Sequence, residues 1–279
     1  MTIAGDNYFG LEDKVVVAWG GTGTLIGIIA EGMALHGAKI ILLGRDEVKG
    51  RERMQRIQEM DCSAELILAD VSDCDGITSV RDEIYQRHGR VDVLINGAGG
   101  NKSFATVDGE KIKTFCDIEP DDWQEVFDLN YTWSIVNTSR IFGEKMIAQD
   151  GNSNIINVTS ASAVLPLSKV VAYSAAKAAA LNTTRYLAHE WAQYSIRVNA
   201  LSPGFFPAKQ NMSLIYIGGD PEKGLTERGQ QIHDHTPMYR VGEPKELVGP
   251  SLLLASDHVN SFMTGEEMRV DGGFTQITI

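Results

Sequence analysis

The 279-residue sequence has no run of about 20 apolar residues, so we expect no membrane-spanning helix. Basic residues are also scarce, because 25 Lys and Arg stand against 37 Asp and Glu, for a formal net charge of −12. This balance disfavours binding to nucleic acid or to an anionic membrane surface. The N-terminal stretch lacks a basic region followed by an apolar one, so no signal peptide is expected.

Cysteine is scarce too. Cys62, Cys74 and Cys116 lie far apart, with no CxxC pair and no Cys/His spacing of a zinc site. We therefore expect reduced thiols and a cytoplasmic protein. His233 and His235 have no third ligand in the sequence, so no metal site is expected.

Hydrophobic residues make up 43% of the chain, which is enough for the core of one large domain. Short apolar runs alternate with longer amphipathic segments, and several runs are apolar throughout, as in parallel strands covered on both faces. The runs are 14–19, 39–43, 64–69, 91–96, 154–159, 196–201 and 268–270. This order predicts an α/β fold, with residues 1–279 forming a single Rossmann-type, doubly wound domain that has a parallel sheet of about seven strands and helices on both faces.

One long connection, at about 204–240, is rich in Gly, Pro, Asn and His. Connections of this length are usually lids or binding loops, so we predict a lid-like loop. An irregular surface loop is the alternative.

The stretch VVVAWGGTGTLIG, residues 15–27, has the outline of a strand, a glycine-rich turn and a helix start. Glycines at such a turn let the backbone approach a pyrophosphate at the helix N-terminus. A tight turn without a ligand explains the glycines equally well, so this stretch does not establish a cofactor site by itself.

The second run ends in Leu43-Gly44-Arg45-Asp46. A site for NAD usually has a carboxylate here for the ribose 2′-hydroxyl, whereas Arg45 can pair with a 2′-phosphate. The pattern favours NADP(H), with NAD(H) as the alternative. A merely solvated arginine also fits.

Further motifs follow in a fixed order along residues 9–276. They are Asp70-Val71, Asn96-Gly97-Ala98-Gly99, Asn130, Ser160, Tyr173 with Lys177, Pro203-Gly204 and Val270-Asp271-Gly272-Gly273. Tyr173 follows Ser160 by thirteen residues. This ordered set resembles the short-chain dehydrogenase/reductase family.

The glycine-rich turn departs from the family pattern, because Trp19 replaces a threonine and Thr24 and Ile26 replace glycines. NGAGGN (96–101), KTFCDI (113–118), PGFF (203–206) and HTPMYRVGEP (235–244) are similar to the D-mannonate oxidoreductase (fructuronate reductase) subgroup. We still predict that the turn lines a cofactor.

The resemblance implies a cofactor-binding half at 14–100 and a catalytic and substrate-binding half at 101–279. The implied cofactor contacts are Gly20, Thr22, Gly23, Thr24, Leu25, Ile26, Arg45, Asp70, Val71, Asn96, Gly97, Ala98, Gly99, Tyr173, Lys177, Pro203 and Gly204. It also implies pairing into homodimers or homotetramers.

Tyr173 and Lys177 are four residues apart on a predicted helix and so share a face. A neighbouring ammonium lowers the pKa of a phenol, which would let Tyr173 exchange a proton with a carbonyl or an alcohol. Ser160 would hold the carbonyl oxygen. The resemblance assigns Asn130 to a water-mediated proton relay.

The expected substrate is a keto acid or hydroxy acid of the sugar-acid class, with D-fructuronate and D-mannonate as the leading pair. Candidate contacts are Asn101, Lys102, Ser162, Gln210, Asn211 and Arg240, which can bind carboxylate and hydroxyl groups. A gluconate-type dehydrogenase and a 3-oxoacyl reductase are the alternative enzymes. A non-catalytic nucleotide-binding or scaffold protein is the alternative from another class.

Overall fold

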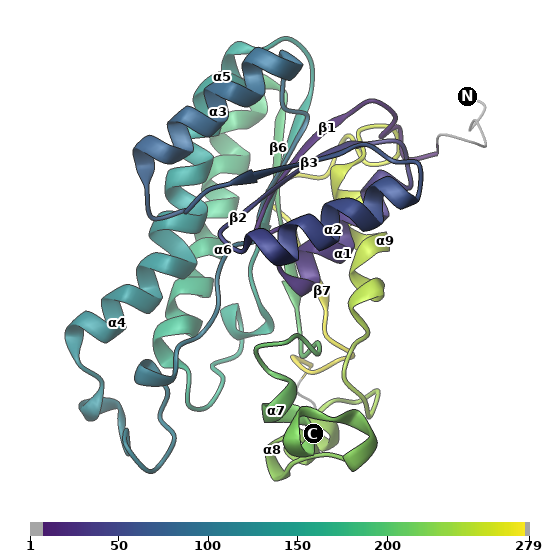
Figure 1. Ribbon diagram of the computed structural model, residues 1–279. Helices are drawn as coiled ribbons and strands as arrows, with labels where there is room; N and C mark the ends of the chain where they lie inside the picture. Colours follow the sequence, from purple (N-terminus) through teal and green to yellow (C-terminus); the bar gives the residue numbers. More distant parts are fainter. Residues whose placement is uncertain (1–7, 277–279) are drawn as a thin grey trace.

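The computed structural model describes residues 8–276 (Figure 1). Its seven strands form one parallel sheet in the order β3-β2-β1-β4-β5-β6-β7. The strands are β1 (Val15–Trp19), β2 (Lys39–Gly44), β3 (Ala64–Leu68), β4 (Val93–Asn96), β5 (Ser153–Val158), β6 (Ile196–Pro203) and β7 (Glu267–Val270). The predicted doubly wound fold is confirmed, and each strand begins and ends within two residues of the predicted run.

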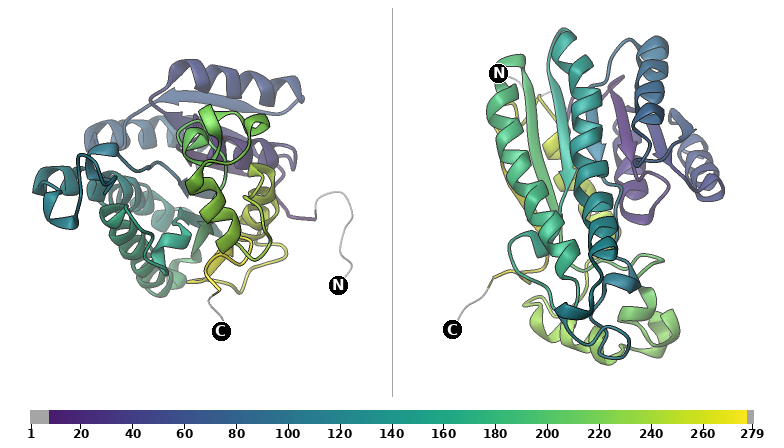
Figure 2. Two further views of the ribbon diagram at one scale, coloured as in Figure 1. Left: turned by 90° about the horizontal axis from the view of Figure 1, so that it is seen from below. Right: turned by 90° about the vertical axis from the view of Figure 1, so that its left-hand side faces the viewer.

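Helices cover both faces of the sheet (Figures 1 and 2). One face carries α1 (Thr24–Ala34), α2 (Glu47–Glu59) and α9 (Val248–Ala255). The other carries α3 (Cys74–His88), α5 (Thr138–Ala148) and α6 (Val171–Trp191). A π-helical segment, Asp128–Asn137, joins α4 (Pro120–Phe127) to α5, and this continuous helix runs beside α6 (Figure 2).

The two cores follow from side-chain alternation along the buried strands. In β1, Val16 and Ala18 pack beneath α1 and α9, while Val17 and Trp19 point to the opposite face, toward α3 and α5. Every residue of β1 is buried. This explains why the run is apolar throughout rather than alternating.

The lid segment (204–240) is more regular than its composition predicts. It contains α7 (Met212–Ile215) and α8 (Glu227–His235), which lie together beyond the end of the sheet (Figure 1). Thr226 caps α8, because its side chain accepts a hydrogen bond from the Gly229 N–H.

The sheet has its topological switch at β1, which lies between β2 and β4. The chain runs outward from β1 through β2 to β3, and then crosses to β4 on the other side. In open parallel sheets, ligands bind at the carboxyl ends of the strands beside such a point.

Candidate active site

A cavity of about 870 Å³, called the crevice below, lies at this switch point. The predicted site residues that line it are Gly20, Thr22, Gly23, Thr24, Leu25, Ile26, Arg45, Val71, Gly97, Ala98, Gly99, Asn101, Lys102, Ser160, Tyr173, Lys177, Pro203, Gly204, Gln210 and Asn211. The predicted site residues outside its wall are Asp70, Asn96, Asn130, Ser162 and Arg240. One continuous crevice thus joins the glycine-rich turn to the Ser-Tyr-Lys group.

The glycine-rich turn is shaped for close backbone approach. Gly20 has a φ of +84°, and a Cβ on it would lie 2.8 Å from the carbonyl carbon of Gly97. Gly23 precedes α1 and has no side chain to cap the helix. The first N–H groups of α1 therefore remain for a ligand such as a pyrophosphate.

The unusual residues of the turn leave the crevice open. Trp19 is 1% exposed and packs edge-on against Phe142, with 6.5 Å between ring centroids, on the face away from α1. Ile26 is 4% exposed and lies against the backbone of Gly97. Thr24 is half-buried at the wall.

The end of β2 forms one bank of the crevice. Nη1 of Arg45 lies 3.1 Å from Oδ2 of Asp70, and the Asp70 carboxylate also accepts a hydrogen bond from the Ser72 N–H. Asp46 caps α2, because it accepts a hydrogen bond from the Lys49 N–H and pairs with the Lys49 ammonium. Arg45 therefore lines the crevice, whereas Asp70 lies outside the crevice wall and is paired with Arg45.

The side chain of Asn96 has a structural role. It is fully buried and donates to Oγ of Ser139 and to Oδ1 of Asn157. It thereby ties β4 to α5 and β5, and the three residues that follow it line the crevice instead.

The structure brings Ser160, Tyr173 and Lys177 together. Nζ of Lys177 lies 5.6 Å from the centre of the Tyr173 ring, on the same side of α6, and donates to the Val158 carbonyl oxygen at 2.9 Å. Ser160 follows β5 and forms a hydrogen bond with Tyr173. Lys177 is 4% exposed, so its ammonium lies in a poorly solvated place.

Burial dominates the electrostatics of this group. It raises the pKa of the Tyr173 phenol, and the hydrogen bond with Ser160 only partly offsets it. Burial also lowers the pKa of Lys177 to about 8, because the charged form is the poorly solvated one. The sequence predicted a phenol pKa lowered by Lys177. In the structure, desolvation raises this pKa instead, so the phenol is a proton donor rather than a phenolate, and a lowering by Lys177 stays a prediction.

Asn130 lies in the π-helical segment and is fully buried. Its Nδ2 donates to the Gly100 and Val126 carbonyl oxygens, and its Oδ1 accepts from the Gly100 N–H. The side chain therefore holds the loop after β4 in place. Its role in a proton relay stays a prediction.

The predicted substrate contacts divide into two sets. Asn101, Lys102, Gln210 and Asn211 line the crevice, with Nζ of Lys102 3.7 Å from Oε1 of Glu125. The Ser162 hydroxyl is buried without a hydrogen-bond partner, and Arg240 is held by Glu246 through two hydrogen bonds away from the crevice wall. Arg240 is thus already occupied by a carboxylate of the chain itself.

Several lining residues were missed from the sequence, including Asp46, Lys49 and Lys209. Asp46 and Lys49 follow Arg45 on the same bank. Lys209 directly precedes the predicted Gln210 and Asn211. Each of the three lies within four residues of one already chosen from the sequence, but the position of Lys209 depends on how the lid segment folds.

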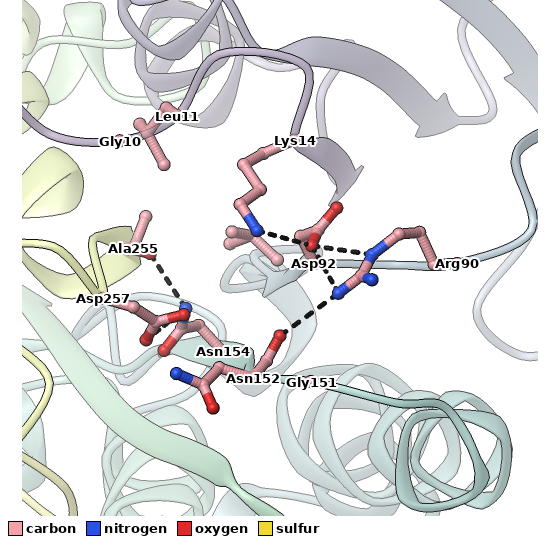
Figure 3. Close-up of a pocket in the computed structure, with 11 residues that line it drawn as sticks. Gly10, Leu11, Lys14, Arg90, Asp92, Gly151, Asn152, Asn154, Ala255 and Asp257 are labelled. Carbon is pink, nitrogen blue, oxygen red and sulfur yellow. Dashed lines mark hydrogen bonds and ion pairs between the residues drawn. The ribbon is translucent and has the colours of Figure 1, made fainter. Parts of the chain in front are cut away.

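A second cavity, of about 370 Å³, lies at the amino ends of β1, β4 and β5 (Figure 3). There the 3%-exposed Asp92 pairs with Lys14 and Arg90, and it also accepts a hydrogen bond from the Val15 N–H. These bonds link the starts of β1 and β4. The charged groups of this cavity form ion pairs with one another, as expected for a cluster that stabilises the fold.

Along residues 8–276, no helix is long and apolar enough to cross a membrane. Within the same range, no three His, Cys, Asp or Glu side chains gather as metal ligands. His233 instead lies beside Asp234, and the His235 ring packs against Phe274.

Known proteins share both this sequence and this fold. A family model described as enoyl-(acyl carrier protein) reductase matches residues 26–275. The oxidoreductase UxuB of Bacillus subtilis (strain 168), described as uncharacterized, is 37% identical over 270 residues, which cover 95% of each chain.

Two solved structures are similar over nearly their whole length. A candidate D-mannonate oxidoreductase from Haemophilus influenzae, with bound NAD, has a TM-score of 0.89 and 34% identity over 98% of this chain and 99% of the other. A gluconate 5-dehydrogenase from Burkholderia cenocepacia J2315, in complex with NADP and tartrate, has a TM-score of 0.84 and 28% identity, with the same coverage. The chain therefore belongs to the short-chain dehydrogenase/reductase family, and it is an oxidoreductase.

Proposed function

We propose that the protein interconverts a keto group and a secondary alcohol on a sugar acid, with D-fructuronate and D-mannonate as the leading pair. The observation that carries this proposal is the meeting of Ser160, Tyr173 and Lys177 at the wall of the crevice that begins at the glycine-rich turn. A bound nicotinamide cofactor would supply or accept the hydride.

The chain's own residues would manage the proton and the orientation. Ser160 holds the carbonyl oxygen, and the protonated Tyr173 phenol donates its proton to that oxygen as it gains negative charge. Lys177, with a pKa of about 8, lies close enough to stabilise the phenolate that remains.

The crevice fits a nicotinamide dinucleotide. Gly20 lets a ligand approach the backbone of the turn closely, and Gly23 leaves the N-terminus of α1 uncapped. Arg45 offers a cation at the end of β2. We propose NADP(H) as the preferred cofactor, with NAD(H) as the alternative. The two similar structures named above hold one of each.

The sugar-acid assignment is supported by the polar side chains beyond the Ser-Tyr-Lys group. Lys102 offers a cation, and Asn101 and Gln210 offer amides, for a carboxylate and hydroxyls. The names of the two similar structures, a mannonate oxidoreductase candidate and a gluconate dehydrogenase, point to the same class. A gluconate-type substrate is therefore the second candidate, ahead of a 3-oxoacyl group.

The test is an assay of D-fructuronate, a gluconate-type keto acid and a 3-oxoacyl thioester, each with NADPH and NADH. Highest kcat/KM on fructuronate supports the leading pair, and highest kcat/KM on another substrate replaces it. A parallel titration of both cofactors addresses the scaffold alternative, because a protein stabilised by neither at millimolar concentration is not this enzyme.

We also propose a cytoplasmic homodimer or homotetramer. Residues 8–276 contain no membrane-spanning helix, and α6 carries an exposed aromatic, Tyr186, whose side chain a second subunit would cover. Sedimentation of the purified protein measures the assembly state, and a monomer at all concentrations excludes this arrangement.

A further inference from the structure

The tip of the lid segment, residues 206–211, is a fixed turn. Oδ1 of Asn211 accepts from the Ala208 N–H at 2.7 Å, and its Nδ2 donates to the Phe206 carbonyl oxygen at 2.9 Å. Phe206 is 4% exposed, and its ring fills the space beside Gly242, where a Cβ would lie 2.3 Å from a ring carbon. The tip is thus anchored by a buried ring and braced by an amide.

Two exposed side chains, Lys209 and Gln210, project from the braced tip, and both line the crevice. Oε1 of Gln210 lies 3.4 Å from where a Cβ on Gly100 would be, so Gln210 reaches the loop after β4. Lys209 lines the same crevice as Arg45, Asp46 and Lys49. The pKa of Asp46 is lowered chiefly by hydrogen bonds from Lys49, and the positive charge of Lys209 adds to that effect.

The crevice wall at the end of β2, taken together with Lys209, carries an excess of positive charge. Arg45 pairs with Asp70 and Lys49 pairs with Asp46, and Lys209 adds a third cation, so the five groups carry a net charge of +1. Both carboxylates already accept hydrogen bonds from groups of the chain, so a ribose hydroxyl would have to share them with those donors. A phosphomonoester dianion suits such a cluster, since it can pair with several cations at once.

We propose that Lys209 is a cofactor-specificity residue, which reaches from the lid tip and completes, with Arg45 and Lys49, a three-cation cradle for the 2′-phosphate of NADP(H). This inference rests on the proposed function, because it requires a dinucleotide in the crevice. It makes the lid segment part of the cofactor site as well as of the substrate site.

The test compares ligands that differ only in the 2′-phosphate. We would measure the Kd of 2′,5′-ADP against 5′-AMP, and of NADPH against NADH, for the wild type and Lys209→Ala by titration calorimetry. We expect Lys209→Ala to weaken 2′,5′-ADP and NADPH about tenfold, as for the loss of one charge-assisted contact. Binding of 5′-AMP and NADH should change less than about twofold.

Two further variants sharpen the result. Lys209→Arg should retain most of the preference for the phosphorylated ligands, because it keeps the charge. Lys223→Ala removes a lysine of the same lid segment that lies outside the crevice wall, so it should leave all four Kd values unchanged.

The remaining outcomes separate this inference from the function on which it rests. Equal losses for both ligand pairs, or no loss, would show that Lys209 does not read the 2′-phosphate. A wild type that binds NADH but not NADPH overturns the inference and leaves the reductase proposal standing. A wild type that binds neither dinucleotide overturns both.

Discussion

The side chain of Ile26, in the first turn of α1, occupies the space where a side chain on Gly97 would begin. A Cβ on Gly97 would lie 2.4 Å from both Cγ1 and Cδ1 of Ile26. Residues 26 and 97 are far apart in the sequence but share one volume beside the crevice. The absent side chain at 97 is therefore what lets the chain carry an isoleucine where the family pattern has glycine.

This relationship predicts coupling between the two positions. Gly97→Ala should cost about 1–3 kcal/mol of unfolding free energy through overpacking, since Gly97 has no positive φ to add strain. Ile26→Ala should cost about 2–4 kcal/mol, and the double variant at least about 1 kcal/mol less than the sum. Urea unfolding measures all three. Pairing Gly97→Ala with Ile29→Ala, one turn further along α1, should give additive costs; equal non-additivity there would refute a local contact.

At position 19 we expect the family's usual threonine to make this protein less stable. Restoring the threonine with Trp19→Thr should destabilise the protein by about 3–5 kcal/mol, because the indole fills the core against Phe142. The Kd for the cofactor should change little, since the bulk of the side chain lies on the other face of the sheet. Thermal unfolding and cofactor titration check both parts, and a threonine variant as stable as the wild type would contradict this packing.

Tyr173→Phe tests the proton donor. The variant keeps the ring but lacks the hydroxyl, so kcat should fall by about 10²–10⁴-fold, while the Kd of the cofactor should stay within about threefold. Steady-state kinetics and a binding titration give the two numbers. Tyr131→Phe removes a hydroxyl that bonds to Thr183 elsewhere and should leave kcat nearly unchanged. Near-normal turnover of Tyr173→Phe would remove the phenol from the mechanism.

Replacing Lys177 should stabilise the folded protein, although we propose a catalytic role for this residue. Its pKa falls from 10.5 to about 8 on burial, so below pH 8 the folded state carries the full cost of a buried charge. Between pH 8 and 10.5 the unfolded state binds more protons, and stability therefore rises with pH through this window. At pH 7 the buried ammonium costs about 3 kcal/mol of unfolding free energy. Replacing Lys177 relieves this cost but also removes the hydrogen bond to Val158, which contributes about 1 kcal/mol.

The expected result is that Lys177→Met unfolds at higher urea than the wild type at pH 7, by about 2 kcal/mol, and loses this advantage by pH 10. Lys223→Met, at an exposed lysine, should show no such trend. A Lys177→Met variant that is less stable at pH 7, or whose advantage does not depend on pH, would show that the ammonium is not strained by burial.

The sequence by itself determined the strands, the order of the motifs and the family, because these features depend on short-range periodicity and on fixed spacing along the chain. The four-residue step from Tyr173 to Lys177 places both on one helix face in any α-helix. Only the tertiary structure decided the contacts between distant residues. It buried Trp19 against Phe142, used Asn96 and Asn130 as internal ties, paired Arg240 with Glu246 and placed Lys209 in the wall of the same crevice as Asp46. Each of these depends on where a side chain from another part of the chain happens to lie, and neither hydrophobic pattern nor residue type encodes that position locally.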